Sequence, residues 1–387
     1  MKRIVYLCCL VMTCLTMMAQ IDTTDRNWRL VLEDDFSTPG RYWNTQFMDM
    51  PLKKWAAYSV GSGVTHGAHE HQVYQRSQCV FDMQDSTMNL VATYTGGPLT
   101  EAQCELPGGS HFRAEDTTLF YFSGWLDSYD TYHNLDKFQY GYFEIRCKLP
   151  VHCGAFPAFW LWGNGIPSDK HYEEIDIFEY SWVVSKKCGL PLGSTNCITT
   201  GIHFNPDTTA YYYQDRYARL YHTIPGLNVS GWNVYGCEWS PGKVIWTLNG
   251  SVINEYYDVS HIPYLPMRLK TNYAIDDYAY SNIDSITVNT IPYWQGTDQM
   301  KIDYIRVYQL TWDCDTDERI ENQNDFDFFD YSVKKSIVVD PSSGGVNVNN
   351  PLQVNFKATE SIELHGEFVI PANSTFMIYD CPIQIVQ

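Results

Sequence analysis

The sequence is poor in basic residues. Its 387 residues include 26 lysines and arginines against 45 aspartates and glutamates, which gives a formal net charge of −19 at pH 7. A chain this acidic repels a polyanion such as DNA or RNA. The composition therefore excludes nucleic acid as a partner.

Long hydrophobic runs are also scarce. Beyond the N-terminus no segment approaches the roughly 18 uninterrupted apolar residues of a membrane-spanning helix. The N-terminus itself begins Met-Lys-Arg, continues with a short apolar run and reaches Ala19, which is the pattern of a signal peptide. A lipid-modified Cys14 is the alternative, but the residues before it suit a lipoprotein signal poorly. We predict that residues 1–19 are removed and that the mature chain is exported, to the periplasm, the cell surface or the medium.

No cysteine spacing resembles a zinc site. Of the 12 cysteines, three leave with the signal peptide and nine enter a compartment that permits disulfides. An odd number means that at least one is unpaired or pairs between chains. Cys188 and Cys197 bracket a loop rich in glycine and proline, and we predict a local disulfide between them. Two free thiols in a surface loop are the alternative.

Helical periodicity is almost absent. From Trp28 to Leu310 the chain consists of short alternating apolar runs broken by Gly, Pro, Asn and Asp, which is typical of β-strands in two sheets. One of these runs ends at Asn249-Gly250, the strongest short signal for a hairpin turn. The sequence predicts an all-β fold.

The composition changes near residue 312. Residues 313–330 are acidic and polar, which suits a linker, and residues 331–387 contain short β-forming runs. We predict a large β domain over residues 20–312, an acidic linker over 313–330 and a small C-terminal β module over 331–387. About 55 residues provide only a thin core for such a module.

One short stretch places three carboxylates among strong β-forming residues. Strand parity puts Glu174 and Asp176 on one face and sends Glu179 to the other. A β-bulge near Ile177 or Phe178 would return Glu179 to the first face. Like charges on one face are destabilising, so their presence indicates catalysis. The alternatives are a solvated strand face, which the aromatic flanks disfavour, and a calcium loop, which would not contain Ile and Phe.

The geometry of such a bulged strand indicates a reaction class. Long glutamate side chains at both ends can lean inward over the shorter aspartate. This would bring the two end carboxyls to the ~5–5.5 Å separation of a retaining glycosidase, short of the ~6.5–9.5 Å of an inverting one. Aromatic residues make up 15% of the chain, including 12 Trp and 29 Tyr, and supply faces on which sugar rings stack.

The carboxylate stretch resembles the bulged E-x-D-x-x-E signature of glycoside hydrolase family 16. Other segments agree with the family in the same order: Glu70–Tyr74, Ser123–Trp125, Tyr140–Pro150, Pro157–Trp160, His203–Phe204, Trp232–Trp239 and Ile302–Tyr308. The resemblance covers residues 28–310. It implies a concanavalin-like β-jelly-roll sandwich whose concave sheet carries the active site, followed here by the small β module.

The resemblance also implies residue roles. Glu174 is the expected nucleophile, Glu179 the expected acid and then base, and Asp176 the residue that orients Glu174. No cofactor is required for catalysis. A structural calcium ion, on the face away from the cleft and held partly by Asp303, is implied by the family; an ordinary surface aspartate is the alternative.

Substrate contacts are expected from residues aligned with the family's cleft or flanking the carboxylate strand: Glu70, Gln72, Trp125, Phe156, Trp160, Trp182 and His203. Laminarinase-like members usually carry Arg at the position of Trp125 and Trp at the position of Phe156. A lone histidine such as His203 is also often structural.

The implied function is a secreted, endo-acting, retaining β-glycoside hydrolase whose partner is a polysaccharide. A β-1,3-glucan such as laminarin is the leading substrate. A galactan, or a host glycan cut by an endo-β-galactosidase, is the alternative on the same site, as is a transglycosylase. A non-catalytic carbohydrate-binding protein is less favoured, because it would not need three carboxylates.

Overall fold

The computed structural model describes most of the chain between Trp28 and Asp380. The described residues are 28–37, 55, 70–104, 119–128, 137–164, 172–182, 184–205, 215–240, 243–275, 294–310, 312–327, 329, 333–342, 344–347, 353–370 and 375–380. The predicted signal peptide, residues 1–19, lies outside them. No helix within these ranges is long and apolar enough to cross a membrane.

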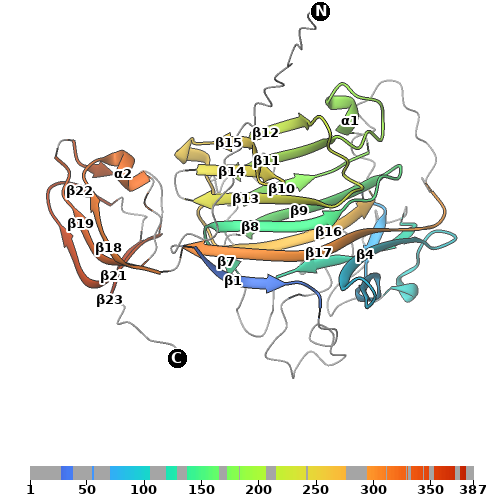
Figure 1. The fold of residues 1–387 in the computed structure, drawn as a ribbon, viewed down its shortest axis with the longest axis horizontal. Coiled ribbons are helices and arrows are strands. Elements are labelled where there is room, and N and C mark those ends of the chain that lie inside the picture. The colour runs from blue at the N-terminus through green and yellow to red at the C-terminus, as the bar shows by residue number, and fades with distance from the viewer. Residues whose placement is uncertain are drawn as a thin grey trace, which may run out of the picture.

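Two antiparallel sheets form the larger part of the molecule (Figure 1). The ten-stranded sheet contains β1 (Trp28–Asp34), β2 (Gln72–Tyr74), β3 (Cys79–Asp82), β4 (Thr87–Tyr94), β5 (Tyr121–Ser123), β8 (Gly141–Lys148), β13 (Asn233–Ser240), β14 (Lys243–Leu248), β15 (Ser251–Tyr256) and β17 (Thr297–Leu310). Among the strands that the structure describes in this sheet, β2 and β5 are the pair that runs parallel.

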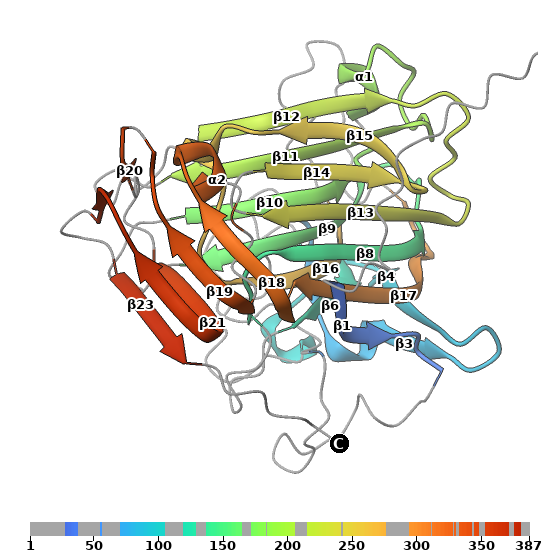
Figure 2. The same ribbon diagram turned by 60° about the vertical axis from the view of Figure 1, so that its left-hand side comes forward.

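The seven-stranded sheet is the second layer. It contains β6 (Trp125–Asp127), β7 (Lys137–Phe138), β9 (Ala155–Asn164), β10 (Tyr172–Glu179), β11 (Cys197–Asn205), β12 (Asp215–Thr223) and β16 (Met267–Ile275). Its central order is β12-β11-β10-β9-β16-β6, so the chain leaves and re-enters each sheet several times (Figure 2). The short helices are α1 (Val184–Lys187), α2 (Gln323–Asp327) and the 3₁₀ turns η1 (Arg76–Gln78), η2 (Glu101–Gln103) and η3 (Val259–His261).

The core lies between these two sheets. Alternate residues of each strand point into it, as the period of two in the sequence predicts. Phe178 of the seven-stranded sheet meets Tyr235 of the ten-stranded sheet with ring centroids 4.3 Å apart. Trp239 and Trp246 are fully buried there. The all-β prediction is thus confirmed.

The predicted Asn249-Gly250 hairpin is also confirmed. It joins β14 to β15, with φ of 49° at Asn249 and 80° at Gly250. Both values lie in the left-handed region that a type I′ turn requires, where Asn and Gly are least strained.

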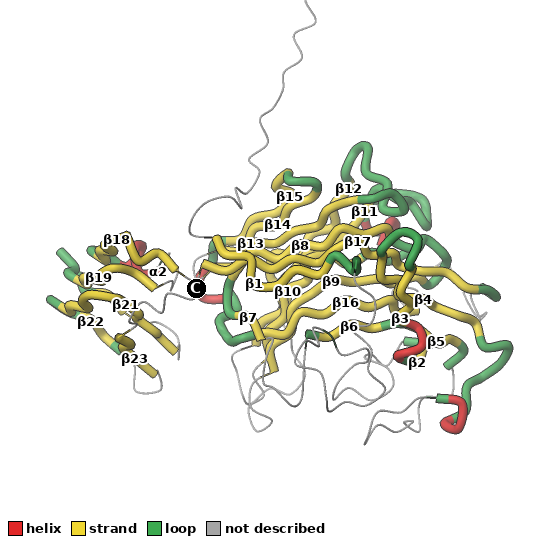
Figure 3. Tube along the Cα trace, turned by 60° about the horizontal axis from the view of Figure 1, so that its bottom comes forward, coloured by secondary structure: helices red, strands yellow, loops and turns green. Residues whose placement is uncertain are grey.

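A smaller group of parallel strands follows β17 (Figure 3). One sheet has the order β18 (Trp312–Ile320), β19 (Val333–Val339), β21 (Gln353–Leu364), β23 (Thr375–Asp380), and β20 (Val346–Asn347) pairs with β22 (Phe368–Val369). Its core is separate from that of the sandwich and includes Ile337, Val339 and Phe356.

The predicted acidic linker over residues 313–330 is wrong. Most of this stretch belongs to the C-terminal module, as strand β18 and helix α2, and Ile320, Phe326 and Phe329 are buried in its core. Asp317 of β18 is exposed and faces Lys335 at 3.5 Å. Glu318 is half-buried, and its charge is met by the buried Lys334 at 3.5 Å.

Candidate active site

Strand β10 lies in the middle of the seven-stranded sheet, paired with β9 on one side and β11 on the other. Along β9, Asp176 is opposite Trp160 and Phe178 is opposite the next residue, Phe159. Ile177 is therefore one extra residue on β10. The register against β11 shifts at the same point. This is the predicted β-bulge.

The bulge determines which side chains of β10 point into the core and which lie on the opposite face of the sheet. Ile175, Ile177 and Phe178 are all buried in the core. The carboxylates of Glu174 and Asp176 lie together on the other face. Consecutive apolar residues at 177 and 178 are accommodated because the bulge turns both toward the core.

A tryptophan from the opposite sheet fixes the backbone at the bulge. Trp246 of β14 is fully buried and its Nε1 donates a hydrogen bond to the carbonyl oxygen of Asp176 at 2.8 Å. A bulge disrupts the strand ladder locally, so this carbonyl gains a partner through the core instead. The sequence carries no signal for this bond.

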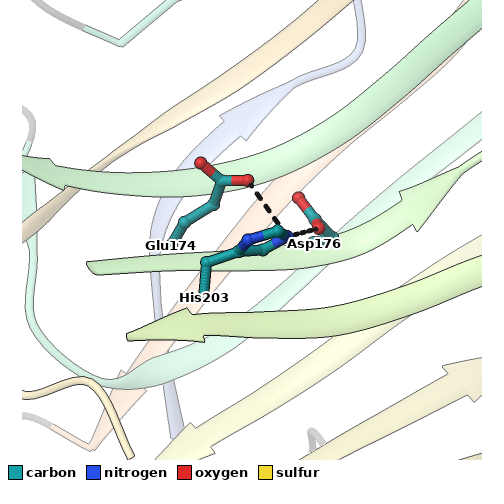
Figure 4. A group of neighbouring side chains, drawn as sticks. All are labelled: Glu174, Asp176 and His203. Carbon is teal, nitrogen blue, oxygen red and sulfur yellow. Dashed lines mark ion pairs between the residues drawn. The ribbon is translucent and has the colours of Figure 1, made fainter. Parts of the chain in front are cut away.

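His203 of β11 lies beside two of the carboxylates (Figure 4). Its Nε2 is 3.2 Å from Oδ2 of Asp176 and 3.8 Å from Oε1 of Glu174. Burial lowers the pKa of His203, but the neighbouring charges of Glu174 and Asp176 outweigh burial and raise this pKa to about 9. His203 is therefore a cation at neutral pH.

The charge of His203 acts back on Asp176. Burial alone would raise the pKa of this carboxyl, but the hydrogen bond and charge of His203, the charge of Arg219 and a hydrogen bond with Glu174 lower it. Asp176 is consequently an anion, fixed next to Glu174. Such a residue can accept a hydrogen bond or orient a neighbour, but it is a poor proton donor.

Two cationic residues near the carboxylates gave no signal in the sequence. Arg219 of β12 places Nη2 3.6 Å from Oε2 of Glu179. Lys270 of β16 is fully buried, with Nζ 2.7 Å from Oδ2 of Asp127. Burial lowers the pKa of Lys270 to about 8, against the opposing effect of Asp127.

Lys270 is surrounded by tryptophans of the same sheet. Its Nζ lies 4.9, 5.3 and 4.7 Å from the ring centroids of Trp125, Trp160 and Trp162. Trp160 is directly opposite both Asp176 and Lys270 in the sheet. The aromatic cluster is thus continuous with the carboxylate strand and contains two of the predicted contact residues, Trp125 and Trp160.

The other predicted contact residues occupy different positions. Gln72 is fully buried and engaged within the protein: its Oε1 accepts from the backbone N–H of Ile275 at 2.6 Å, and its Nε2 donates to Glu70. Phe156 is half-buried on β9, with the same strand parity as Trp160. Contact of these residues with substrate stays a prediction.

Trp182 follows β10 and packs against the cysteine-bracketed loop. Cys188 and Cys197 form a disulfide with Cα atoms 6.6 Å apart. The backbone N–H of Gly193 donates to the carbonyl of Trp182 at 2.9 Å, and a Cβ at Gly193 would lie 2.4 Å from Nε1 of Trp182. The loop therefore fits closely around Trp182.

Glu173, which directly precedes the expected nucleophile, has a structural position. It is fully buried, and its Oε2 accepts from the backbone N–H groups of Tyr264 and Leu265 at 2.9 and 2.7 Å. It ties β10 to the segment that precedes β16.

The described residues contain one group of three or more metal-type ligands, Glu174, Asp176 and His203, whose atoms lie within 4.8 Å of one another. In this structure Nε2 of His203 is an ion-pair partner of both carboxylates. Asp303, predicted to hold calcium, forms an ion pair with Arg146. The calcium ion stays a prediction.

With this geometry in place, comparison with known proteins defines the class. Residues 125–306, which include the carboxylate strand and both neighbouring strands, match the model of glycosyl hydrolases family 16. This part of the chain, from β6 to β17 of the sandwich, is thus similar to glycosyl hydrolases family 16.

Individual proteins resemble this chain at low sequence identity. The chain is similar to the endo-1,3-1,4-beta-glycanase ExsH of Rhizobium meliloti (strain 1021), 26% identical over 229 residues, 59% of this chain and 40% of that protein. It is similar to a beta-glucanase of Rhodothermus marinus, 24% identical over 335 residues, 80% of this chain and 95% of that protein. The chain spans less than half the length of ExsH.

Solved structures agree on the fold. The laminarinase catalytic domain from Thermotoga maritima MSB8 matches with a TM-score of 0.50 and 20% identity, over 73% of this chain and 98% of that one. A chain from a study of endo-acting O-glycanases of the human gut microbiota matches with a TM-score of 0.52 and 19% identity, over 74% and 92%.

Proposed function

We propose that this protein is an exported, endo-acting, retaining β-glycoside hydrolase that cleaves a polysaccharide. The observation that supports this most is the bulged strand β10, which places Glu174 and Asp176 on one face beside a buried His203. The match of residues 125–306 to the model of glycosyl hydrolases family 16 supports the same reaction class.

In the first step, a carboxylate oxygen of Glu174 attacks the anomeric carbon while Glu179 gives its proton to the departing glycosidic oxygen. A covalent glycosyl-enzyme forms and the leaving chain takes the proton. In the second step, Glu179, now a carboxylate, removes a proton from water, and the water oxygen displaces Glu174. Two displacements at one carbon give net retention.

Asp176 and His203 act through Glu174. Asp176 is held as an anion by His203 at 3.2 Å, and through this shared cation it helps to keep Glu174 oriented. His203 is a cation 3.8 Å from Glu174 and offsets the repulsion between the paired carboxylates. This permits Glu174 to stay ionised, as a nucleophile must.

A β-glucan is the leading substrate, with β-1,3 linkages first. The names of the relatives, an endo-1,3-1,4-beta-glycanase and a beta-glucanase, favour it. Trp125 and Phe156, which replace residues usual in laminarinase-like members, keep a galactan or host glycan as the second candidate.

The test is incubation with laminarin, mixed-linkage glucan, agarose, carrageenan and mucin glycans, followed by product analysis. We expect endo-cleavage of one glucan by wild type and loss of turnover, with binding retained, in Glu174→Gln. Glu255→Gln, an exposed position on β15, is the matched control and should keep full activity. Turnover by Glu174→Gln would place the nucleophile elsewhere. Sugar-chain transfer products without hydrolysis would indicate a transglycosylase, and binding without products a lectin-like protein.

A further inference from the structure

Strand β12 carries a second bulge, two strands away from the first. Thr200 of β11 is opposite Leu220, but Ile202 is opposite Tyr217, so β12 has one extra residue between these pairs. Ala218 lies in this interval with φ of 50°, a left-handed conformation that a residue with a Cβ rarely adopts. Strain of this kind persists only where the surroundings impose it.

A buried asparagine from the ten-stranded sheet imposes the strained conformation of Ala218. Nδ2 of Asn254 on β15 donates to the carbonyl oxygen of Ala218 at 2.9 Å and to Oγ1 of Thr200 at 3.0 Å. The bulge is thus locked to the neighbouring strand and to the core. The residue that follows the strained position is Arg219.

The side chain of Arg219 extends from β12 toward β10. A Cβ added to Gly201 of β11 would meet the Cα and Cβ of Arg219 at 3.5 Å, so the arginine stem lies next to the space that this glycine leaves open. Strands are about 4.8 Å apart, so a residue two strands away is reached only by a long side chain. Arg219 covers this distance, and its Nη2 lies 3.6 Å from Oε2 of Glu179.

Other contacts hold the guanidinium in place. Its Cζ lies 5.7 Å from the ring centroid of Tyr221, two residues along the strand. Burial would lower the pKa of Arg219, but the charge of Glu179, followed by that of Tyr221, outweighs burial and raises it. Among the described residues, Glu179 is its one carboxylate partner within ion-pair distance.

We infer that Arg219 is a positioning residue that orients Glu179 and lowers its proton affinity, so that Glu179 is poised to switch from acid to base. This inference rests on the proposed function. A nearby cation makes Glu179 a stronger acid toward the leaving oxygen, and it stabilises the carboxylate that must then accept a proton from water. The proton affinity of Glu179 also sets the pH above which Glu179 has lost its catalytic proton.

The proton affinity of Glu179 depends on the charged groups of the described strands around it. On its own strand stand Glu174 and Asp176, and on β11 stands His203, whose charge Glu179 also affects. On β12 stand Arg219 and Tyr221. On the β9 side the opposite residue is an alanine, which has no charge. Arg219 also affects Asp176 through its charge, but its contact within ion-pair distance is with Glu179, at 3.6 Å.

The direct experiment measures the titration of Glu179 in the whole protein, by NMR of ¹³C-labelled glutamate carboxyls assigned with Glu179→Gln. We expect Arg219→Met to raise the midpoint of Glu179 by about one pH unit, the lower end of the range for a carboxylate beside arginine. Arg219→Lys keeps the charge and should return the midpoint toward wild type. Arg319→Met, which removes one exposed cation of the C-terminal module, should leave it unchanged.

The catalytic consequence is read from kcat/KM against pH, on whichever polysaccharide of the panel the wild type cleaves. The alkaline limb should move upward in Arg219→Met by the same amount. If Arg219→Met does not fold, as judged by thermal melting, Arg219→Gln carries the same expectation. A Glu179 midpoint that is the same with and without the cation would overturn the inference while leaving the proposed function intact. Turnover by Glu174→Gln would overturn the proposed function while leaving the titration result intact.

Discussion

His203 is the residue on which the charge balance of the carboxylate face depends. It is nearly buried and contacts both Glu174 and Asp176 through one nitrogen. Its pKa of about 9 exceeds the ordinary value of 6.5, because it gains anionic partners on folding. Folding therefore favours the protonated form, and the protonated form favours folding.

This coupling predicts how stability depends on pH. The contribution of His203 is fully present below its unfolded pKa of about 6.5 and is lost as pH rises through about 9. The Tm of wild type should fall across this window, and the Tm of His203→Gln should fall less. His365→Gln, on an exposed histidine of the C-terminal module, is the control and should follow wild type. Parallel curves for wild type and His203→Gln would contradict the assignment.

At the scale of elements, β10 shows what a sequence can and cannot reveal. The alternation of Glu174, Ile175 and Asp176, broken at Ile177, is sufficient to predict a strand, a bulge, and one face for Glu174 and Asp176. These features are local, because a two-residue period is visible in a short stretch. The cationic site residues outside this strand could not be predicted in this way.

The positions of the two cations that the sequence did not reveal, Arg219 and Lys270, depend on pairings between distant segments. Arg219 reaches Glu179 only because β11 and β12 pair in one register and β12 bulges. Lys270 meets Asp127 because β16 pairs with β6, more than a hundred residues earlier in the chain. No local pattern in the sequence reports a register, so neither cation was predicted.

The Lys270–Asp127 pair offers a test of how the tryptophan cluster is supported. Breaking a buried pair leaves an unpaired charge, so Lys270→Met should lower the free energy of unfolding by about 3–5 kcal/mol. The double variant Asp127→Asn/Lys270→Met should recover most of this loss. Lys243→Met, which breaks a more exposed pair with Glu238, should cost less than about 1 kcal/mol. Chemical denaturation measures all three, and equal losses in the single and double variants would refute the buried-pair account.

The loop between Cys188 and Cys197 is the second element with a testable role. Peptide mapping without reduction should yield a linked fragment, and replacing both cysteines by serine should lower the free energy of unfolding by roughly 2–3 kcal/mol. Because the loop fits around Trp182, we expect KM to change more than kcat. Alkylation of both cysteines in the native protein would exclude the bond.

At the scale of the whole molecule, the boundary between the domains was the weakest prediction. Acidic composition predicts a linker, but strand β18 exposes Asp317, pairs Glu318 with Lys334 and buries Ile320. Parallel pairing with β19 stabilises this segment and is invisible to composition. The sandwich was predicted correctly because its strands repeat one simple pattern.

A calcium ion at Asp303 would stabilise the whole sandwich and take no part in the chemistry. Chelation with EDTA should then lower the Tm, because a ligand that binds only the folded state stabilises it, and leave activity at low temperature unchanged. Asp303→Asn should remove the effect of chelation. Since Asp303 also pairs with Arg146, the control is Arg146→Met, which should keep the response to EDTA. A Tm that is insensitive to EDTA in wild type would exclude the site.

The central claim is that Glu174 and Glu179 carry out two successive displacements at one anomeric carbon. It is tested most directly by ¹H NMR of the first products released from a β-linked polysaccharide, before mutarotation mixes the anomers. The account predicts that the β-anomer appears first, since a double displacement retains configuration. Initial appearance of the α-anomer would contradict it, because water would then have attacked the sugar directly and Glu174 would not be a nucleophile.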